Sequence, residues 1–382
     1  MARIDGRHRI RRPAINTVRP VPVPGLPDFQ VGLLPQDPWC AAVLKPMPRP
    51  RQHAACAVGF CALAALVLCI ASPPVFGAEA SRPGVEEPPA WAYPVNPPDF
   101  KPAVDDGSLR HVPGSSQAYT LTQLRDFFMA PDWHPGDHPV MPDVVARGRK
   151  PEVLACGFCH RADGPGGPEN ANLAGLPAAY IVKQMADLKS GARKSSVPSR
   201  LPSTFMTSLA VAASATEIAA AAGYFSALKP RANVSVVETA WVPQTYVAGW
   251  HLAALPGGGR EPINRRIIEV PETLEHFVSR DSHAQFIAYV PVGSIEAGRA
   301  LVAGGGEGRT VPCAGCHGPD LRGLGDIPRL AGRSPTYLVR QLYDFKHGAR
   351  AGSGSVLMQP TVERLEIDDM IAIAAYAASL PP

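Results

Sequence analysis

The sequence has 382 residues, and its main part, residues 81–382, carries almost no net charge. Residues 81–382 contain 28 Lys and Arg against 29 Asp and Glu. The formal net charge of +4 arises in residues 1–80, which hold nine basic and four acidic side chains. A surface that binds nucleic acid needs a clustered excess of basic residues, so the near-neutral body argues against a nucleic-acid partner.

Cysteine is also scarce in the body of the chain. Four of the eight cysteines lie within residues 1–80, which leaves Cys156, Cys159, Cys313 and Cys316. These four form two CxxC pairs, "CGFCH" and "CAGCH", and each pair is followed at once by a histidine. Three chemistries use two thiols at this spacing: a zinc clip, a thiol–disulfide switch and a covalent haem anchor.

The basic excess near the N-terminus predicts export. A short basic segment, 47–53, precedes an uncharged apolar run, 54–71, and a segment with small residues at Ala78 and Ala80. Val75 and Gly77 offer a second cleavage position. This order is typical of a secretory signal, which predicts a periplasmic protein; an uncleaved run of 18 residues would instead anchor it in the membrane. Because basic signal regions are short, we expect translation to start at Met47.

An internal repeat selects the haem anchor among the three chemistries. Zinc ribbons place their CxxC halves roughly 15–20 residues apart, and a thioredoxin-type switch needs a βαβ pattern that neither motif has. A shift of 157 residues aligns 156–193 with 313–350 without a gap, and 16 of the 38 positions are identical. Two copies of CxxCH predict two covalently bound haem c groups, with His160 and His317 directly beneath the irons.

A second alignment supplies candidates for the sixth iron ligand. A shift of 152 residues aligns 214–227 with 366–379, and it pairs Met206 with Met358 eight residues before each final helix. We expect both methionines to lie in loops and to bind iron. Met129, Met141, Met185 and Met370 have no aligned methionine in the other copy, so we expect them in the core or on the surface.

The two copies resemble the periplasmic two-domain, two-haem cytochromes c of class I. The resemblance covers residues 141–230 and 291–382 and rests on CxxCH, "LAG…Y", "KQ…D..K.G.R" and the paired methionines. It implies a mainly α fold, with two tandem small helical domains and His/Met ligation by His160 with Met206 and His317 with Met358. It also implies that the ligating histidines donate to the carbonyls of Ala171 and Pro328. The family usually has a proline at this position, which Pro328 matches and Ala171 does not.

Two segments depart from that family. Residues 231–290 form a longer connector than the family has, with β-like runs in "NVSVVETAWV", "NRRIIEVP" and "AQFIAYVP". Residues 81–140 form a Pro-rich extension, part of the reason for the 43 prolines of the chain. We expect its first part, 82–118, to drape over the surface, and both additions to provide packing and haem shielding.

His/Met ligation closes all six iron positions and so predicts an electron carrier without catalytic residues. The expected partners are redox proteins: a quinol-oxidising complex, a dehydrogenase or a terminal oxidase. Two alternatives stay open, a cytochrome subunit of a dehydrogenase or oxidase complex and a dihaem peroxidase with one open haem. Arg193, Arg350, Tyr180 and Tyr337 are candidate contacts of the haem propionates. We expect His134 and His138 in a solvated turn, and the remaining histidines, His283 among them, isolated.

Overall fold

The computed structural model describes residues 86–382, which belong to one compact unit. The expected signal segment, its cleavage positions and the start at Met47 lie outside these residues. Within 86–382, no helix is both long enough and apolar enough to cross a membrane. Below, residues 141–230 are the first repeat, 291–382 the second repeat, 86–140 the arm and 231–290 the connector.

The first repeat consists of five helices around one apolar core. They are α3 (Asp143–Ala146), α4 (Cys156–His160), α5 (Ala178–Lys189), α6 (Leu201–Ala212) and α7 (Ala215–Ala227). Helix α7 begins with a capping box, since Ser214 accepts from the Glu217 N–H and Glu217 accepts from the Ser214 N–H. The buried side of α7 carries Tyr224 and Phe225 into the core that also holds Leu176 and Ile181.

The second repeat follows the same plan with a separate core. Its helices are α9 (Ser294–Gly304), α10 (Ala314–His317), α11 (Pro335–Lys346), the 3-10 turn η1 (Ser353–Leu357), α12 (Gln359–Val362) and α13 (Ile367–Ser379). Helix α11 is capped by Ser334, whose side chain accepts from the Tyr337 N–H at 3.2 Å, and Pro335 occupies the first turn. Helices α9 and α13 cross tightly at Gly298, where a Cβ atom would lie 2.0 Å from the Ala372 carbonyl oxygen.

The connector contains the strands of the described chain. The three β-like runs form β1 (Val234–Glu238), β6 (Ile268–Pro271) and β7 (Phe286–Val290), in a sheet of order β1-β7-β6. Strand β1 pairs parallel with β7, and β6 pairs antiparallel with β7. Two small hairpin-like pairs add β2 (Trp241–Pro243) with β5 (Arg260–Pro262), and β3 (Thr245–Val247) with β4 (Leu252–Ala254). The short helix α8 (Leu274–Val278) precedes β7.

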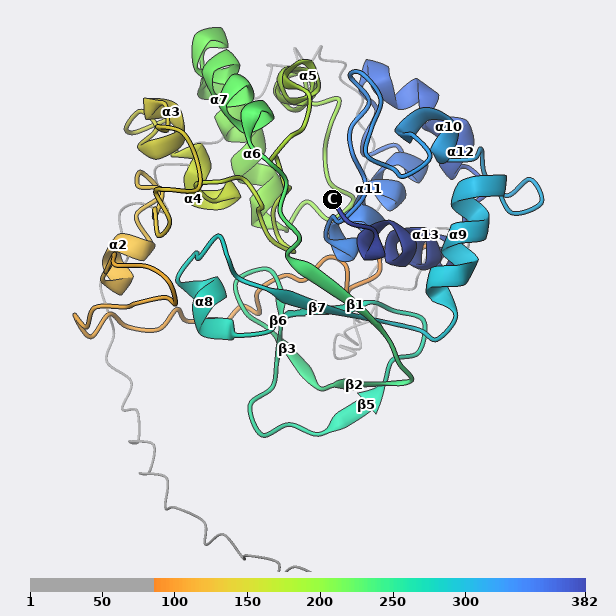
Figure 1. Ribbon diagram of the computed structural model, residues 1–382, viewed down its shortest axis with the longest axis horizontal. Coiled ribbons are helices and arrows are strands. Elements are labelled where there is room, and N and C mark those ends of the chain that lie inside the picture. Colours follow the sequence, from red (N-terminus) through yellow and green to blue (C-terminus); the bar gives the residue numbers. More distant parts are fainter. Residues whose placement is uncertain (1–85) are drawn as a thin grey trace, which may run out of the picture. The chain divides into compact units, whose positions relative to one another are not determined.

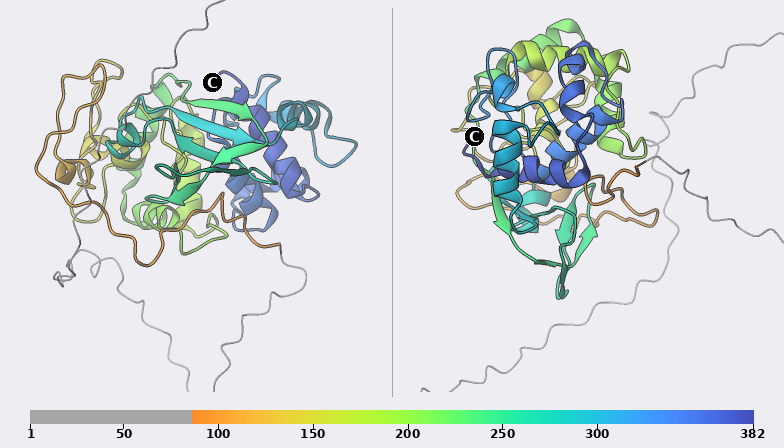
Figure 2. Two further views of the ribbon diagram at one scale, coloured as in Figure 1. Left: turned by 90° about the horizontal axis from the view of Figure 1, so that it is seen from below. Right: turned by 90° about the vertical axis from the view of Figure 1, so that its right-hand side faces the viewer.

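Figures 1 and 2 show the helices of the two repeats as two groups, with the strands lying along one side of both.

The arm contributes to the core of the protein as well as to its surface. It contains one short helix, α2 (Leu121–Leu124), and is otherwise irregular. The expectation that 82–118 merely drapes over the surface is wrong for Ala92 and Tyr93, which are buried in the core of the second repeat. The Tyr93 hydroxyl donates to Asp344 at 2.8 Å, and Arg340 donates to the Ala92 carbonyl at 2.7 Å. Both α11 residues therefore bind the arm with polar contacts that the proline count does not reveal.

Glu217 at the start of α7 gives a pH-dependent prediction. Hydrogen bonds from Arg149, then from the backbone and side chain of Ser214, lower the pKa of Glu217 to about 2. A lowered carboxyl pKa stabilises the fold above the ordinary pKa of glutamate, and this contribution is lost as the pH falls toward 2. Glu217→Gln should therefore cost about 0.5–1 kcal/mol in urea unfolding at pH 7, and the difference should shrink as the pH falls below 4.

The matched control is Glu152→Gln. Glu152 also accepts from Arg149, at 3.1 Å, but it is more exposed and lies outside the cap. Its replacement should leave the free energy of unfolding nearly unchanged at both pH values. An equal loss in the two variants would assign the effect to Arg149 in general and contradict the role of the cap.

Candidate haem sites

Each CxxCH motif forms a single helical turn. The two thiols are three residues apart and therefore lie on one side of the turn, with Cys156 beginning α4 and Cys313 capping α10, and the histidine follows at the C-terminal end. Burial raises the pKa of Cys156 to about 12 and that of Cys313 to about 11, so both are neutral thiols rather than reactive thiolates. Cys156 packs against one core and Cys313 lies in the other, whereas a zinc ribbon needs all four sulfurs around one ion.

Both motif histidines are oriented by the same backbone contact. His160 Nδ1 lies 2.8 Å from the carbonyl oxygen of Ala171, and His317 Nδ1 lies 2.8 Å from that of Pro328. The expected acceptor carbonyls are therefore present in both repeats, and alanine supplies the contact as well as proline does. Burial lowers the pKa of both imidazoles and keeps them neutral. A neutral ring that donates through Nδ1 keeps the lone pair of Nε2 for a metal.

The two candidate methionines occupy different local structures. Met358 lies at the junction of η1 and α12, between two short turns. Met206 lies within helix α6, so its expected place in a loop is wrong: Pro202 near the helix start favours a continuous helix through this segment. Both side chains are half-buried and pack against the core of their own repeat.

A cavity of about 300 Å³ brings His160 and Met206 to the same space. Apolar side chains of α5 and of the segments around it form much of its wall, and four arginines, Arg193, Arg200, Arg333 and Arg340, are among its polar lining residues. A haem needs such a pocket, with apolar contact for its ring and cations for its two carboxylates. These residues fit a haem. Met185 of α5 lines this cavity too, but its aligned residue in the second repeat is Leu342, which cannot bind iron.

Arg193 and Arg350 form a symmetric network between the repeats. Arg193 donates to Gln184 of its own repeat (2.9 Å) and to Tyr337 (3.2 Å) and Gln341 (3.0 Å) of the other. Arg350 mirrors this set with Gln341 (3.0 Å), Tyr180 (2.8 Å) and Gln184 (2.8 Å). The backbones of the two arginines pair as an antiparallel bridge.

The partners of these two arginines are neutral groups. In the described part of the chain, no carboxylate lies within ion-pair distance of Arg193 or Arg350, although Arg350 is only 7% exposed. Two partly uncompensated buried cations suit the carboxylates of haem propionates. Gln184 and Gln341 are identical residues at aligned positions of the two repeats. This identity was the only sign in the sequence of their shared role, and it predicted no role by itself.

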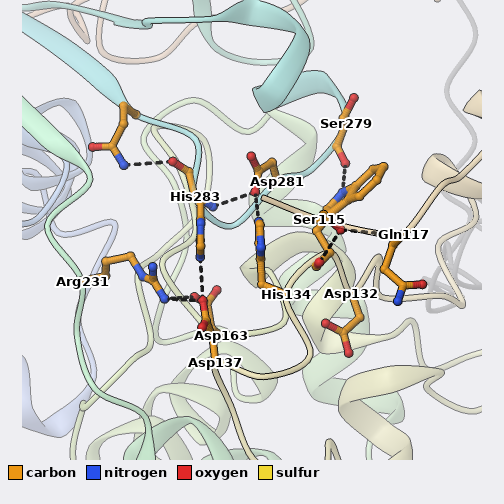
Figure 3. Close-up of polar contacts among 12 residues, drawn as sticks. Ser115, Gln117, Asp132, His134, Asp137, Asp163, Arg231, Ser279, Asp281 and His283 are labelled. Carbon is orange, nitrogen blue, oxygen red and sulfur yellow. Dashed lines mark hydrogen bonds and ion pairs between the residues drawn. The ribbon is translucent and has the colours of Figure 1, made fainter. Parts of the chain in front are cut away.

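A second polar cluster joins the arm, the connector and the first repeat (Figure 3). The rings of His134 and His283 stack with centroids 3.5 Å apart. His134 contacts Asp281 at 2.9 Å, and Asp137 contacts His283 at 2.6 Å and Arg231 at 2.7 Å. The expectations of a solvated turn at His134 and an isolated His283 are therefore wrong, because residues 147 and 146 positions apart in sequence meet here. His138 is also withdrawn from solvent, 3.1 Å from Asp132.

The chain is similar to known haem proteins. No family model matches it. Cytochrome c4 of Azotobacter vinelandii is 26% identical over 243 residues, which is 60% of this chain and 86% of that protein. The thiosulfate dehydrogenase electron acceptor of Thiomonas intermedia is 26% identical over 234 residues, 60% of this chain and 81% of that protein. Cytochrome c-554(548) of Halomonas halodenitrificans is 40% identical over 78 residues, 20% of this chain and 94% of that protein. The paired CxxCH turns, their oriented histidines and these relatives lead to one conclusion: the chain belongs to the cytochrome c family.

Proposed function

We propose that this dihaem electron-transfer cytochrome is a periplasmic carrier of single electrons between a respiratory donor and an acceptor. His160 and Met206 bind one iron, and His317 and Met358 bind the other. The observation that carries the proposal is the repeated orientation of the two histidines, each with Nδ1 held by a carbonyl 2.8 Å away. Arg193, Arg350, Tyr180 and Tyr337 hold propionates at the boundary of the repeats.

When bound, each haem supplies one-electron chemistry at its iron. The chain contributes rigidity: the thiols of α4 and α10 fix the ring, and the Ala171 and Pro328 carbonyls fix the imidazoles. The apolar wall of α5 excludes water from the first site. Closed coordination leaves no position for peroxide or oxygen, which disfavours a peroxidase.

Carbon monoxide binding to the reduced, haem-loaded protein tests this function. We expect the optical spectrum of both haems to stay unchanged under the gas, because a strong sixth ligand occupies each iron. The haem content, measured as two per chain by the pyridine haemochrome assay, is the control. A spectral shift in half of the haem absorbance would contradict the carrier function and favour the dihaem peroxidase.

A dehydrogenase is the donor class that the relatives support. Two of them carry the name of electron acceptor of thiosulfate dehydrogenase. By this likeness, a sulfur-oxidising dehydrogenase is a candidate donor, and the connector and arm provide surface that a complex of this kind would use. Co-purification of a dehydrogenase with the full chain would favour a stable subunit over a free carrier.

A further inference from the structure

The two haem attachment segments align residue by residue but differ in how much of their surface is exposed to solvent. Residues 160–169 of the first repeat are all buried, whereas six of the ten aligned residues, 317–326, are exposed. Cys316 is exposed, while the aligned Cys159 is partly covered. Because a thioether joins the haem edge to the cysteine sulfur, exposure of the cysteine brings that edge to the surface. At this second cysteine, the haem edge of the second repeat therefore lies nearer to solvent than that of the first, whereas at the first cysteine of each motif Cys313 is buried and Cys156 is partly exposed.

The arm covers the first motif from one side. Phe158, inside "CGFCH", is 1% exposed and packs on Phe127 of the arm, with ring centroids 4.6 Å apart. A Cβ atom on Gly157 would lie 2.8 Å from that of Ala130, which shows how closely the arm approaches. The aligned residue of Phe158 is Gly315, which is exposed.

The connector covers the same motif from another side. The Arg280 guanidinium lies 3.6 Å from the centre of the Phe158 ring and donates to the Phe158 carbonyl at 3.1 Å. Phe277 of α8 covers Gly167, where a Cβ atom would lie 3.2 Å from its ring. The residue aligned with Gly167 is Leu324, which is 64% exposed.

The methionine side of the first site is covered as well. Phe205, next to Met206, packs between Phe127 of the arm (5.6 Å) and Trp250 of the connector (6.2 Å). Its aligned residue is Leu357, which is 75% exposed beside Met358. The stacked histidines of Figure 3, and the 2.7 Å hydrogen bond from Trp133 Nε1 to the Ser279 carbonyl, join arm and connector over the first repeat.

From this asymmetry we infer that electrons enter and leave the chain at the second haem alone, through the surface around Cys316, and that the first haem exchanges electrons only through the second. The inference rests on the proposed carrier function. Electron transfer between proteins weakens steeply with distance, so the layer of arm and connector closes the first haem edge to partners. Residues 307–326 then form one electron port.

The port fits a redox protein with an apolar, weakly charged docking face. Within the port, Val311 and Leu324 leave 45% and 64% of their surface exposed, and next to Met358 in the sequence, Val356 and Leu357 leave 72% and 75% exposed. The charges of 307–326 nearly cancel, with Glu307, Asp320 and Asp326 against Arg309 and Arg322. Large exposed apolar side chains are the groups from which contact surfaces are built. A partner that matches this surface would dock through apolar contact rather than through long-range charge.

A charge placed at Leu324 tests the port in the haem-loaded full chain. Leu324→Glu should slow oxidation by ferricyanide, an anion, about threefold to tenfold at low ionic strength. It should accelerate oxidation by the cation tris(phenanthroline)cobalt(III). Both haems should respond equally in stopped-flow absorbance, because the first is oxidised through the second. Leu324 lies in an exposed loop, so the variant should fold.

The control is Val211→Glu on α6 of the first repeat, where Val211 is 58% exposed. It adds the same charge and should leave both rates unchanged. The inference is overturned if Leu324→Glu slows only half of the haem absorbance, or if Val211→Glu slows oxidation as much. Failure of the carrier function would appear separately, as carbon monoxide binding to the unmutated protein.

Discussion

Met358→Ala should open the second haem to carbon monoxide while the first haem stays closed. Half of the haem absorbance of the reduced protein is then expected to shift under the gas. Loss of the thioether should also lower the reduction potential of that haem by on the order of a tenth of a volt, within the range of roughly 0.8 V over which axial ligands set haem potentials. Optical redox titration measures this directly.

Met206→Ala is the companion variant and should open the first haem in the same way. Met185→Ala is its matched control, because Met185 lines the same cavity from α5. We expect Met185→Ala to leave the carbon monoxide spectrum and both potentials unchanged. If it opened the first haem and Met206→Ala did not, α5 would hold the ligand, and the equivalence of Met206 with Met358 would fail.

Features formed by residues close together in the sequence were predicted more completely than contacts between distant segments. The CxxCH motifs span only five residues each, and the structure folds both of them as single helical turns. The carbonyl acceptors of both histidines were implied by the resemblance to the two-haem cytochromes c, and both contacts are present. Met206 shows the limit of aligning the repeats, since alignment gave its partner but not the helix that contains it.

Contacts between separate segments of the chain left no comparable signal. Nothing near His134 predicts that its ring stacks on His283, or that Phe127 and Arg280 cover the two sides of Phe158. Such contacts depend on how the arm and connector fold back over the first repeat. Because neither segment has an internal copy, their role could not be inferred from the repeat.

Arg350→Ala should destabilise the junction of the two repeats. The change removes three hydrogen bonds and leaves Tyr180 and Gln184 without a donor from the other repeat. Hydrogen bonds to a buried charged group are strong, so we expect a loss of about 2–4 kcal/mol in the free energy of unfolding. The control Arg265→Ala removes an exposed arginine paired with Asp368 and should leave the free energy of unfolding nearly unchanged.

Two further measurements separate a structural role of Arg350 from a role beside the haem. Removal of a cation close to the haems favours the oxidised iron, so Arg350→Ala should lower a reduction potential, whereas Arg350→Lys should retain it and lose only part of the stability. The double variant with Arg193→Ala should lose less than the sum of the single losses, because both arginines share Gln184 and Gln341. If the reduction potentials are unchanged in all these variants, the two arginines do not contact the propionates. The network then serves only to join the two repeats.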